Sequence, residues 1–186
     1  PEDESAGSRE VPFSRSLYIE REDFMEEANR KFFRLTLGKE VRLKNAYIIK
    51  GKEVVKDVEG TITEIICTYD PLSRSGSGSQ ESQRKVKGTL HWVSALQAHP
   101  IKVNLYDRLF SVEEPDKNKD EDPAQFINPN SLSQVQGYIE PSVSRASLGA
   151  KFQFQRLGYF ILEEKTSDGE MVFNKTVGLR DTWKKS

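Results

Sequence analysis

The chain has 186 residues, of which 31% are charged, and its formal net charge is -1. This length suits one large domain or two small ones, and ten Phe, six Tyr and two Trp argue against general disorder despite a mean hydropathy of -0.66. No apolar run approaches ~18 residues, which excludes a membrane-spanning helix, and one cysteine with two histidines excludes an internal disulfide and a standard Cys/His zinc site. The polar, acidic N-terminus is not a secretory signal, and we expect a cytoplasmic protein.

The first 32 residues predict a tail followed by a helix. Residues 1–10 are polar and acidic, which is typical of a disordered tail. In residues 21–32, Phe24, Ala28 and Phe32 recur every four residues, and acidic side chains lie at the N-terminal end, where the helix dipole favours them. We therefore expect a helix over 21–32, the only convincing helical stretch of the chain.

Short segments rich in β-branched and aromatic residues dominate the rest of the chain. In one of them apolar and basic side chains alternate, which places Val41 and Leu43 on one face of a strand and Arg42 and Lys44 on the other. The segments that predict strands are 17–20, 41–55, 61–69, 87–96, 101–110, 132–140, 151–156, 159–164 and 171–176. Many short strands with one or two short helices predict a mainly β fold of antiparallel barrels or sandwiches.

Two polar stretches interrupt the strands. Residues 73–84 are rich in Ser and Gly and predict a mobile loop. Residues 113–123 belong to an acidic segment, 111–140, that holds two basic against seven acidic residues. We interpret 113–123 as an acidic linker and the best internal boundary, which separates residues 11–112 from residues 124–186.

The densest basic stretch is residues 31–50, with six basic residues, one acid and interleaved aromatic side chains. This pattern suits a surface for single-stranded nucleic acid, since cations meet phosphates while flat side chains stack on unpaired bases. A solvated strand face beside a hydrophobic core has the same composition, so the stretch alone does not decide between the two.

The motifs of common enzyme classes are absent. The sequence has no glycine-rich nucleotide-binding loop of either standard type and no G-x-S-x-G elbow. Cys67 and His91 are conceivable as a nucleophile pair, but each lies in a strand pattern, where a structural role is the commoner one. The sequence therefore favours a binding module over an autonomous enzyme, with no catalytic residues and no metal site.

Seven runs of residues, taken in order, resemble the glutaminyl-tRNA synthetase family in its C-terminal anticodon-binding part. They are SREVPFS (8–14), EEANRKFFRLTLGKEVRLKNAY (26–47), KVKGTLHWVS (85–94), LYDRLFSV (105–112), INPNSL (127–132), FQFQRLGYF (152–160) and FNKTVGLRDTW (173–183). The resemblance covers nearly the whole chain apart from the Ser/Gly loop and the acidic linker.

The resemblance implies two consecutive antiparallel β-barrels that bind the anticodon. Residues 11–112 then form mostly the distal barrel, and residues 124–186 form the proximal barrel, incomplete without upstream strands. In this class I family a separate N-terminal domain joins glutamine to its tRNA with ATP and Mg²⁺, and the HIGH-like and KMSKS-like signatures of that domain are absent here. We therefore expect an inactive part of a monomeric, cytoplasmic ligase, without a cofactor of its own, whose partners are the glutamine tRNA and the catalytic domain.

The resemblance also implies roles for five residues. Arg34 matches the arginine that reads the third anticodon base, and Arg42 matches the arginine at the first base and its phosphate. Lys44 stands where relatives often carry arginine, as a second cationic contact nearby. Gln153 and Arg156 match residues that line the pocket of the middle base.

These roles agree with the chemistry of the side chains, and each has an alternative. Arginine offers a planar fork of donors, glutamine offers a donor and an acceptor together, and both suit the exposed edges of unpaired bases. However, Arg34 and Lys44 are also typical of solvated strands, and Gln153 of a strand surface. Phe33 departs from the family pattern, which has lysine there, so a phosphate contact is lost or replaced by stacking.

Three other interpretations stay open. One is the anticodon-binding part of a glutamyl-tRNA synthetase of eukaryal or archaeal type, which the FQFQR and EVRLKNAY runs disfavour. Another is a structural rRNA-binding β-barrel protein, which the length and the FNKTVGLRDTW ending fit poorly. The third is a purely structural C-terminal domain whose RNA contacts have been lost.

Overall fold

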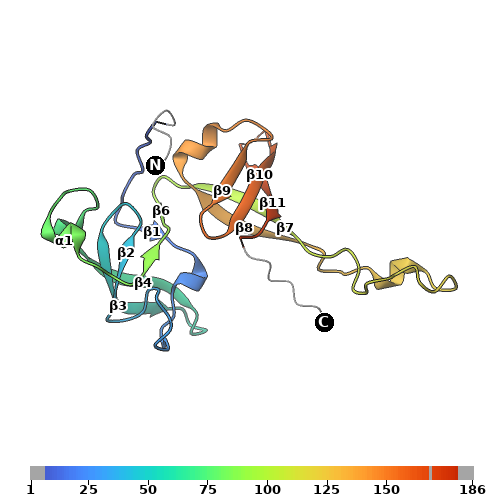
Figure 1. The fold of residues 1–186 in the computed structure, drawn as a ribbon, viewed down its shortest axis with the longest axis horizontal. Helices are drawn as coiled ribbons and strands as arrows, with labels where there is room; N and C mark the ends of the chain where they lie inside the picture. Colours follow the sequence, from blue (N-terminus) through green and yellow to red (C-terminus); the bar gives the residue numbers. More distant parts are fainter. Residues whose placement is uncertain (1–6, 168, 180–186) are drawn as a thin grey trace. The chain divides into compact units, whose positions relative to one another are not determined.

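A computed structural model describes residues 7–167 and 169–179, and the mainly β prediction is confirmed, since strands dominate these residues and only one short α-helix occurs among them. The chain divides into two compact units. Residues Glu10–Gln97 form the first unit, and the described residues on either side of this range form the second. Figure 1 shows the elements of both.

The first unit is built on a four-stranded sheet in the order β4-β3-β2-β5. Its strands are β2 (Glu40–Leu43), β3 (Ile48–Lys56), β4 (Ile62–Asp70) and β5 (Thr89–Leu90), and a smaller sheet pairs β1 (Leu17–Tyr18) with β6 (Val93–Ser94). The β2–β3 and β3–β4 pairs are antiparallel, whereas β2 and β5 are parallel. All of these strands lie within predicted segments or extend them by one residue.

Strand β2 follows the predicted alternation. Val41 and Leu43 are buried, at 1% and 0% exposure, whereas Arg42 is half-buried and Lys44 is exposed. The apolar pair packs into the core of this unit with Leu90 and other buried side chains. This burial fixes the register of β2, because a slip by one residue would place Arg42 in the core.

The predicted helix over 21–32 is wrong. Only a short 3-10 helix, η2 (Arg21–Asp23), forms there, and the chain then runs beside a later segment through an isolated bridge between Phe24 and Leu35. The amide of Leu35 donates to the carbonyl of Asp23, and the amide of Met25 donates to the carbonyl of Leu35. Tertiary pairing thus uses the backbone groups that a helix would need, and it overrides the local periodicity.

The second unit holds a five-stranded sheet in the order β8-β7-β11-β10-β9. Its strands are β7 (His99–Tyr106), β8 (Leu132–Ile139), β9 (Lys151–Phe154), β10 (Gly158–Lys165) and β11 (Met171–Val177), with 3-10 turns η4 (Pro123–Phe126) and η5 (Pro141–Arg145). Only the β7–β11 pair is parallel. Phe154 and Phe160 stack at 4.4 Å between ring centroids in an aromatic core completed by Phe152 and Phe173.

The strand pairings leave both larger sheets open. In the described residues, the outer strands β4 and β5 do not pair with each other, nor do β8 and β9. The anticodon-binding β fold is therefore present without the closed, wholly antiparallel barrels that the resemblance implied. In the first unit the edge strand β5 has only two residues, which is too short to continue the sheet.

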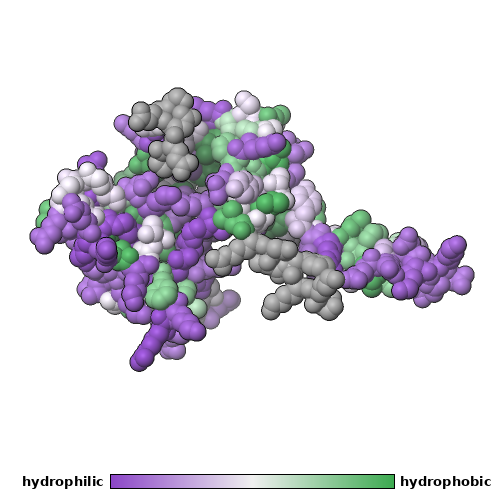
Figure 2. All heavy atoms as spheres, in the orientation of Figure 1, coloured by the Kyte–Doolittle hydropathy of each residue, from purple (hydrophilic) through white to green (hydrophobic). Residues whose placement is uncertain are grey.

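The acidic segment 113–123 is not a linker between domains. It lies at the tip of a long excursion between β7 and β8, which pair along their whole length from His99↔Ile139 to Tyr106↔Leu132. An isolated bridge between Phe110 and Ile127 continues the two-stranded arrangement toward the tip. Figure 1 shows this hairpin reaching out from its sheet, and Figure 2 shows that its tip is hydrophilic. The division between the units falls before β7 instead of within the acidic segment, because β7 pairs with β8 and β11.

The described end of the predicted tail is held to the second unit by an ion pair. Residues 1–6 lie outside the described residues, but the Arg9 guanidinium forms an ion pair with Glu140, with 2.7 Å between Nε and Oε2. The hydrogen bond from Arg9 to Glu140 raises the pKa of Arg9 above its usual value, against the opposing effect of burial. No helix in the part of the chain that the structure describes is long and apolar enough to span a membrane.

Shortening the acidic tip tests its assignment as an excursion. Replacing residues 113–121 by an Asn-Gly turn should leave hydrogen exchange of the Val103 and Val135 amides unchanged, because the register of β7 and β8 does not depend on the tip. Val103→Ala, which removes buried core volume, should accelerate exchange and serves as the positive control. Loss of protection in the shortened chain would mean that the acidic segment supports the sheet.

Candidate nucleic-acid interface

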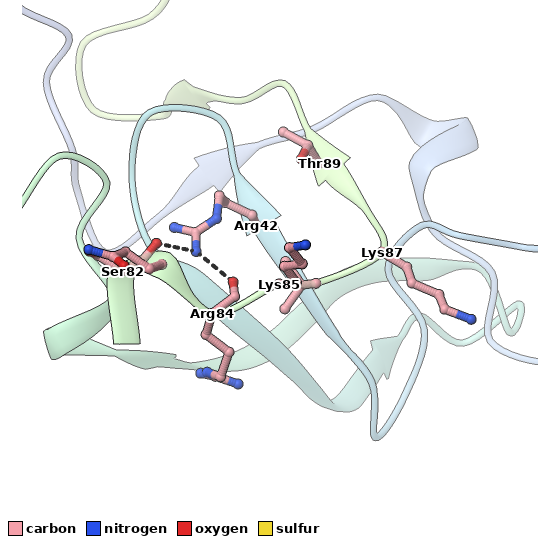
Figure 3. A pocket seen from close by; sticks show the side chains of 8 residues that line it. Arg42, Ser82, Arg84, Lys85, Lys87 and Thr89 are labelled. Carbon is pink, nitrogen blue, oxygen red and sulfur yellow. Dashed lines mark hydrogen bonds between the residues drawn. The ribbon is translucent and has the colours of Figure 1, made fainter. Parts of the chain in front are cut away.

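An open pocket of about 620 Å³ lies beside strand β2 in the first unit. Its lining residues, drawn as sticks in Figure 3, are Arg42, Ser82, Gln83, Arg84, Lys85, Val86, Lys87 and Thr89. We call it the cationic pocket, because four of these residues are basic and none is acidic. The lining is contributed by β2, by the short helix α1 (Gln80–Gln83) and by the segment that leads into β5.

The guanidinium of Arg42 is bound on two sides by the protein. Nη1 donates to the carbonyl of Ser73 at 3.1 Å and to the hydroxyl of Ser75 at 3.3 Å. Nη2 donates to the carbonyls of Ser82 at 2.9 Å and Arg84 at 3.2 Å. Four acceptors thus meet a group that has five N–H donors, and all four are electrically neutral. Figure 3 shows the bonds to Ser82 and Arg84.

The Ser/Gly-rich segment is more ordered than a mobile loop. Ser73 is fully buried, and its hydroxyl accepts from the amide of Ile48 at 2.8 Å. Ser79 caps α1 by accepting from the amide of Ser82, and its own hydroxyl donates to the carbonyl of Leu72 at 2.6 Å. Serine suits these positions because its hydroxyl satisfies backbone groups that a tight turn leaves unpaired.

Arg84 lies on the rim of the pocket with its charge offset by two carboxylates. One Nη group pairs with Glu40, and the other pairs with Asp70 at 3.0 Å. These pairs are exposed and contribute little stability individually. They do orient the side chain of Arg84 away from the carbonyl that Arg42 holds, as Figure 3 shows.

Arg34 is anchored through one edge of its guanidinium. Its Nε lies 3.1 Å from Oδ1 of Asp23, whose side chain is 0% exposed, whereas the Arg34 side chain is 35% exposed. Among the described residues, this is the only interaction recorded for the side chain of Arg34, so both Nη groups are available to a ligand. This arrangement suits recognition of a nucleotide edge, because Asp23 fixes the Nε side of the guanidinium while both Nη groups stay available.

Phe33 and Lys87 lie together beside the pocket. The Phe33 ring is 47% exposed, and the ammonium of Lys87 lies 5.4 Å from its centroid, in a cation–π arrangement. Gly88 makes this approach possible, because a Cβ there would collide with the carbonyl oxygen of Phe33. The aromatic ring at the expected lysine position is thus accompanied by a lysine from another segment.

Lys44 has a fixed backbone and an exposed side chain. Its amide donates to the carbonyl of Leu90 at 2.9 Å, and its carbonyl accepts from Nε1 of Trp92 at 3.0 Å. The Lys44 side chain has no recorded partner within the described ranges. Its position is therefore set by the sheet, while its ammonium remains open to solvent.

Gln153 and Arg156 belong to the second unit and form a separate group. Gln153 is exposed in β9, opposite Tyr159 of β10, while its neighbours Phe152 and Phe154 pack inward. Arg156 lies in the turn that joins these strands and has a φ of 69°, which is uncommon for a residue other than glycine. Strain of this kind often accompanies a functional role.

Of the four basic pocket residues, the sequence-based prediction includes only Arg42 and misses Arg84, Lys85 and Lys87. The signal was present as the run RKVK at 84–87, directly after the Ser/Gly-rich segment. Such a basic run is also typical of a solvated strand, and only the folded chain shows that these residues line the same pocket as Arg42.

The structure gives no support to a cysteine nucleophile or a metal centre. Burial raises the pKa of the Cys67 thiol to about 11, and Cys67 packs against the core of the first unit, so the thiol stays protonated at neutral pH. Within the described part of the chain there is no group of three or more His, Cys, Asp or Glu placed to hold a metal ion.

The ion pair of Arg34 predicts a stability effect that is independent of RNA. Arg34→Ala should lower the free energy of unfolding of the first unit by ~1–2 kcal/mol, because it removes the ion pair between Arg34 and the buried carboxylate of Asp23. Hydrogen exchange of the β2 amides measures this change. Arg30→Ala, at an exposed position with no recorded partner among the described residues, is the matched control and should stay within ~0.5 kcal/mol of the wild type. Equal exchange in both variants would show that the ion pair contributes nothing.

Comparison with known proteins identifies the family. Residues 1–70 and 89–163 match two family models with the same description, "tRNA synthetases class I (E and Q), anti-codon binding domain". The chain is 53% identical over 186 residues to a glutamine–tRNA ligase of Rhodopirellula baltica, and 52% and 54% identical over 187 residues to those of Citrobacter koseri and Salmonella heidelberg. These alignments cover all of this chain but only 31% of the first relative and 33% of the other two, so the chain spans about a third of their length. The chain therefore belongs to the anticodon-binding domain family of the class I tRNA synthetases for glutamate and glutamine (E and Q).

Proposed function

We propose that the chain recognises the anticodon of glutamine tRNA as part of a glutamine–tRNA ligase. The observation that carries this proposal is the cationic pocket, which has four basic and no acidic lining residues in a chain more than half identical to curated glutamine–tRNA ligases. Such a pocket attracts the phosphates of a single strand, and fixed polar groups beside it distinguish the bases.

The proposed contacts follow the chemistry of each side chain. Arg34 offers its open Nη groups to the third anticodon base, and Arg42 belongs to the pocket of the first base, with Lys44 as a second cation nearby. Gln153 and Arg156 serve the middle base, for which the amide of Gln153 supplies both a donor and an acceptor. Bases in an unpaired loop expose the edges that such groups need.

The activity of the whole ligase is proposed by analogy with the relatives. A ligase of this name attaches glutamine to its tRNA, and we propose that a catalytic part outside this chain does so with ATP and Mg²⁺. Among the described residues, no group of three or more His, Cys, Asp or Glu side chains is placed to hold Mg²⁺. The contribution of this chain is binding and orientation of the RNA, in a protein that we propose is cytoplasmic and monomeric.

Anticodon exchange tests the proposed function. A fluorescence titration should show that a stem-loop with a glutamine anticodon binds at least tenfold more tightly than the same stem with all three anticodon bases changed, since each lost base contact costs ~1–3 kcal/mol. The affinity should also fall with added salt, by about 0.7 units of log K per unit of log salt for each phosphate contacted.

Three results would contradict the proposal in different ways. Equal affinity for both stem-loops would remove anticodon recognition. Affinity that is insensitive to salt would remove the phosphate contacts. Tighter binding of a stem-loop with a glutamate anticodon would assign the chain to a glutamyl-tRNA synthetase.

A further inference from the structure

We propose that Arg9 and Glu140 are positioning residues for the bound anticodon loop, because their ion pair gives the two units a second connection. This inference rests on the proposed function, which assigns base-reading side chains to both units, with Arg34 in the first and Gln153 in the second. It is carried by the path of the chain between the units and by the contacts that hold this path at each end.

The chain passes between the two units twice, first directly after Arg9 and again directly before Ala98. Four residues separate Arg9 from Ser14 on the first passage, and four separate Ser94 from His99 on the second. A chain segment of this length reaches at most ~18 Å. Each passage is therefore a short tether wherever both of its ends are held.

Both passages are held at the first unit. The Ser94 hydroxyl donates to the Ser14 hydroxyl at 2.8 Å, and β1 pairs with β6 directly beside them. On the first passage the ring of Phe13 also packs on Tyr47 and Trp92, with 5.0 and 5.3 Å between ring centroids. A hydrogen bond, a strand pair and an aromatic cluster thus fix this end of the connection.

At the second unit, the two passages depend on adjacent residues. His99 begins β7 and pairs with Ile139, the last residue of β8. Glu140 follows directly and binds Arg9 through both carboxylate oxygens, with 2.7 Å from Nε to Oε2 and 2.9 Å from Nη2 to Oε1. A bidentate pair of this kind fixes the direction of the guanidinium as well as its distance. The Glu140 side chain is only 14% exposed, so the carboxylate is the fixed partner of the pair.

Only the second passage is held by the sheet itself. Strand β7 pairs with β8 and β11, so this passage stays attached whether or not the ion pair forms. Across residues 7–15, by contrast, the pair between Arg9 and Glu140 is the only hydrogen bond or ion pair with the second unit among the described residues. Loss of this pair would release the first passage and leave one tether, whose soft backbone dihedrals permit rotations that two tethers exclude.

A fixed spacing between the units lowers the cost of binding a ligand that contacts both. Ordering the mobile parts of a protein on binding costs conformational entropy, and a protein that is already restrained avoids this cost. An anticodon loop read by Arg34 in one unit and by Gln153 in the other is such a ligand. The ion pair should therefore tighten RNA binding although neither of its members touches the RNA.

The first arm of the test measures the freedom of the units in the absence of RNA. Nitroxide labels at Lys52→Cys in β3 and Glu164→Cys in β10, in a Cys67→Ala background, report the distribution of distances between the units by pulsed electron spin resonance. Arg9→Ala and Glu140→Ala should broaden this distribution about twofold, because units joined by a single tether move independently. Arg9→Lys, which keeps an ion pair, should stay closer to the wild-type width. Equal widths in the wild type and in both alanine variants would overturn the proposal.

The second arm compares RNA affinities of variants with opposite changes in charge. Arg9→Ala removes a positive charge and Glu140→Ala removes a negative charge, but each breaks the same ion pair. Both should bind the glutamine-anticodon stem-loop about threefold more weakly than the wild type, since both lose the same restraint. Through charge alone, Glu140→Ala would bind RNA more tightly, because removal of an anion strengthens the attraction for phosphates. Tighter binding by Glu140→Ala would therefore overturn the positioning role.

Arg15→Ala and Glu164→Ala are the matched charge controls. Both residues are exposed, and neither has a recorded partner within the described ranges. Arg15→Ala should leave the distance distribution unchanged, and Glu164→Ala should not weaken RNA binding. Hydrogen exchange of the Val103 amide, in the β7–β8 pair, should match the wild type in every variant. Faster exchange in Arg9→Ala or Glu140→Ala would mean that the pair stabilises the sheet instead of positioning the units, and would overturn the proposal.

The proposed function and this inference fail separately. If the wild-type chain does not distinguish the stem-loops, the proposed function fails, and the distance distributions still decide whether the ion pair restrains the units. If the wild-type chain does distinguish them, and Arg9→Ala and Glu140→Ala bind with wild-type affinity, only the positioning role fails.

Discussion

The shape of the cationic pocket depends on the four hydrogen bonds that Arg42 donates. Strand β2 alternates between core and surface, and the burial of Val41 and Leu43 directs Arg42 to the outer face. There its guanidinium joins the two ends of a segment rich in Ser and Gly, which has little apolar surface of its own to hold it in place. An arginine suits this task because its planar fork meets acceptors on both sides while it keeps its charge.

A second constraint brings separate segments to the same place. Gly88 approaches the carbonyl of Phe33 so closely that no side chain fits between them, and Phe33 directly precedes Arg34. This close approach brings the exposed ring of Phe33 and the ammonium of Lys87 together beside the cationic pocket.

The sequence could predict those elements whose signal is local. The alternation at 41–44 predicts the correct faces of β2. The helix over 21–32 failed because Asp23 and Met25 pair with Leu35, which no local pattern reveals. The acidic segment was misread as a linker because a long hairpin and a linker share the same polar composition. Lys85 and Lys87 carry no local signal that separates a pocket from a solvated strand, since only the folded chain places them beside Arg42.

The structure of the chain bound to a glutamine-anticodon stem-loop is the most direct test of the proposed interface. We expect the anticodon loop to lie against the cationic pocket, with the open Nη groups of Arg34 within hydrogen-bond distance of the third anticodon base. A complex in which the loop binds elsewhere on the chain, with the cationic pocket and Arg34 left in solvent, would contradict the account.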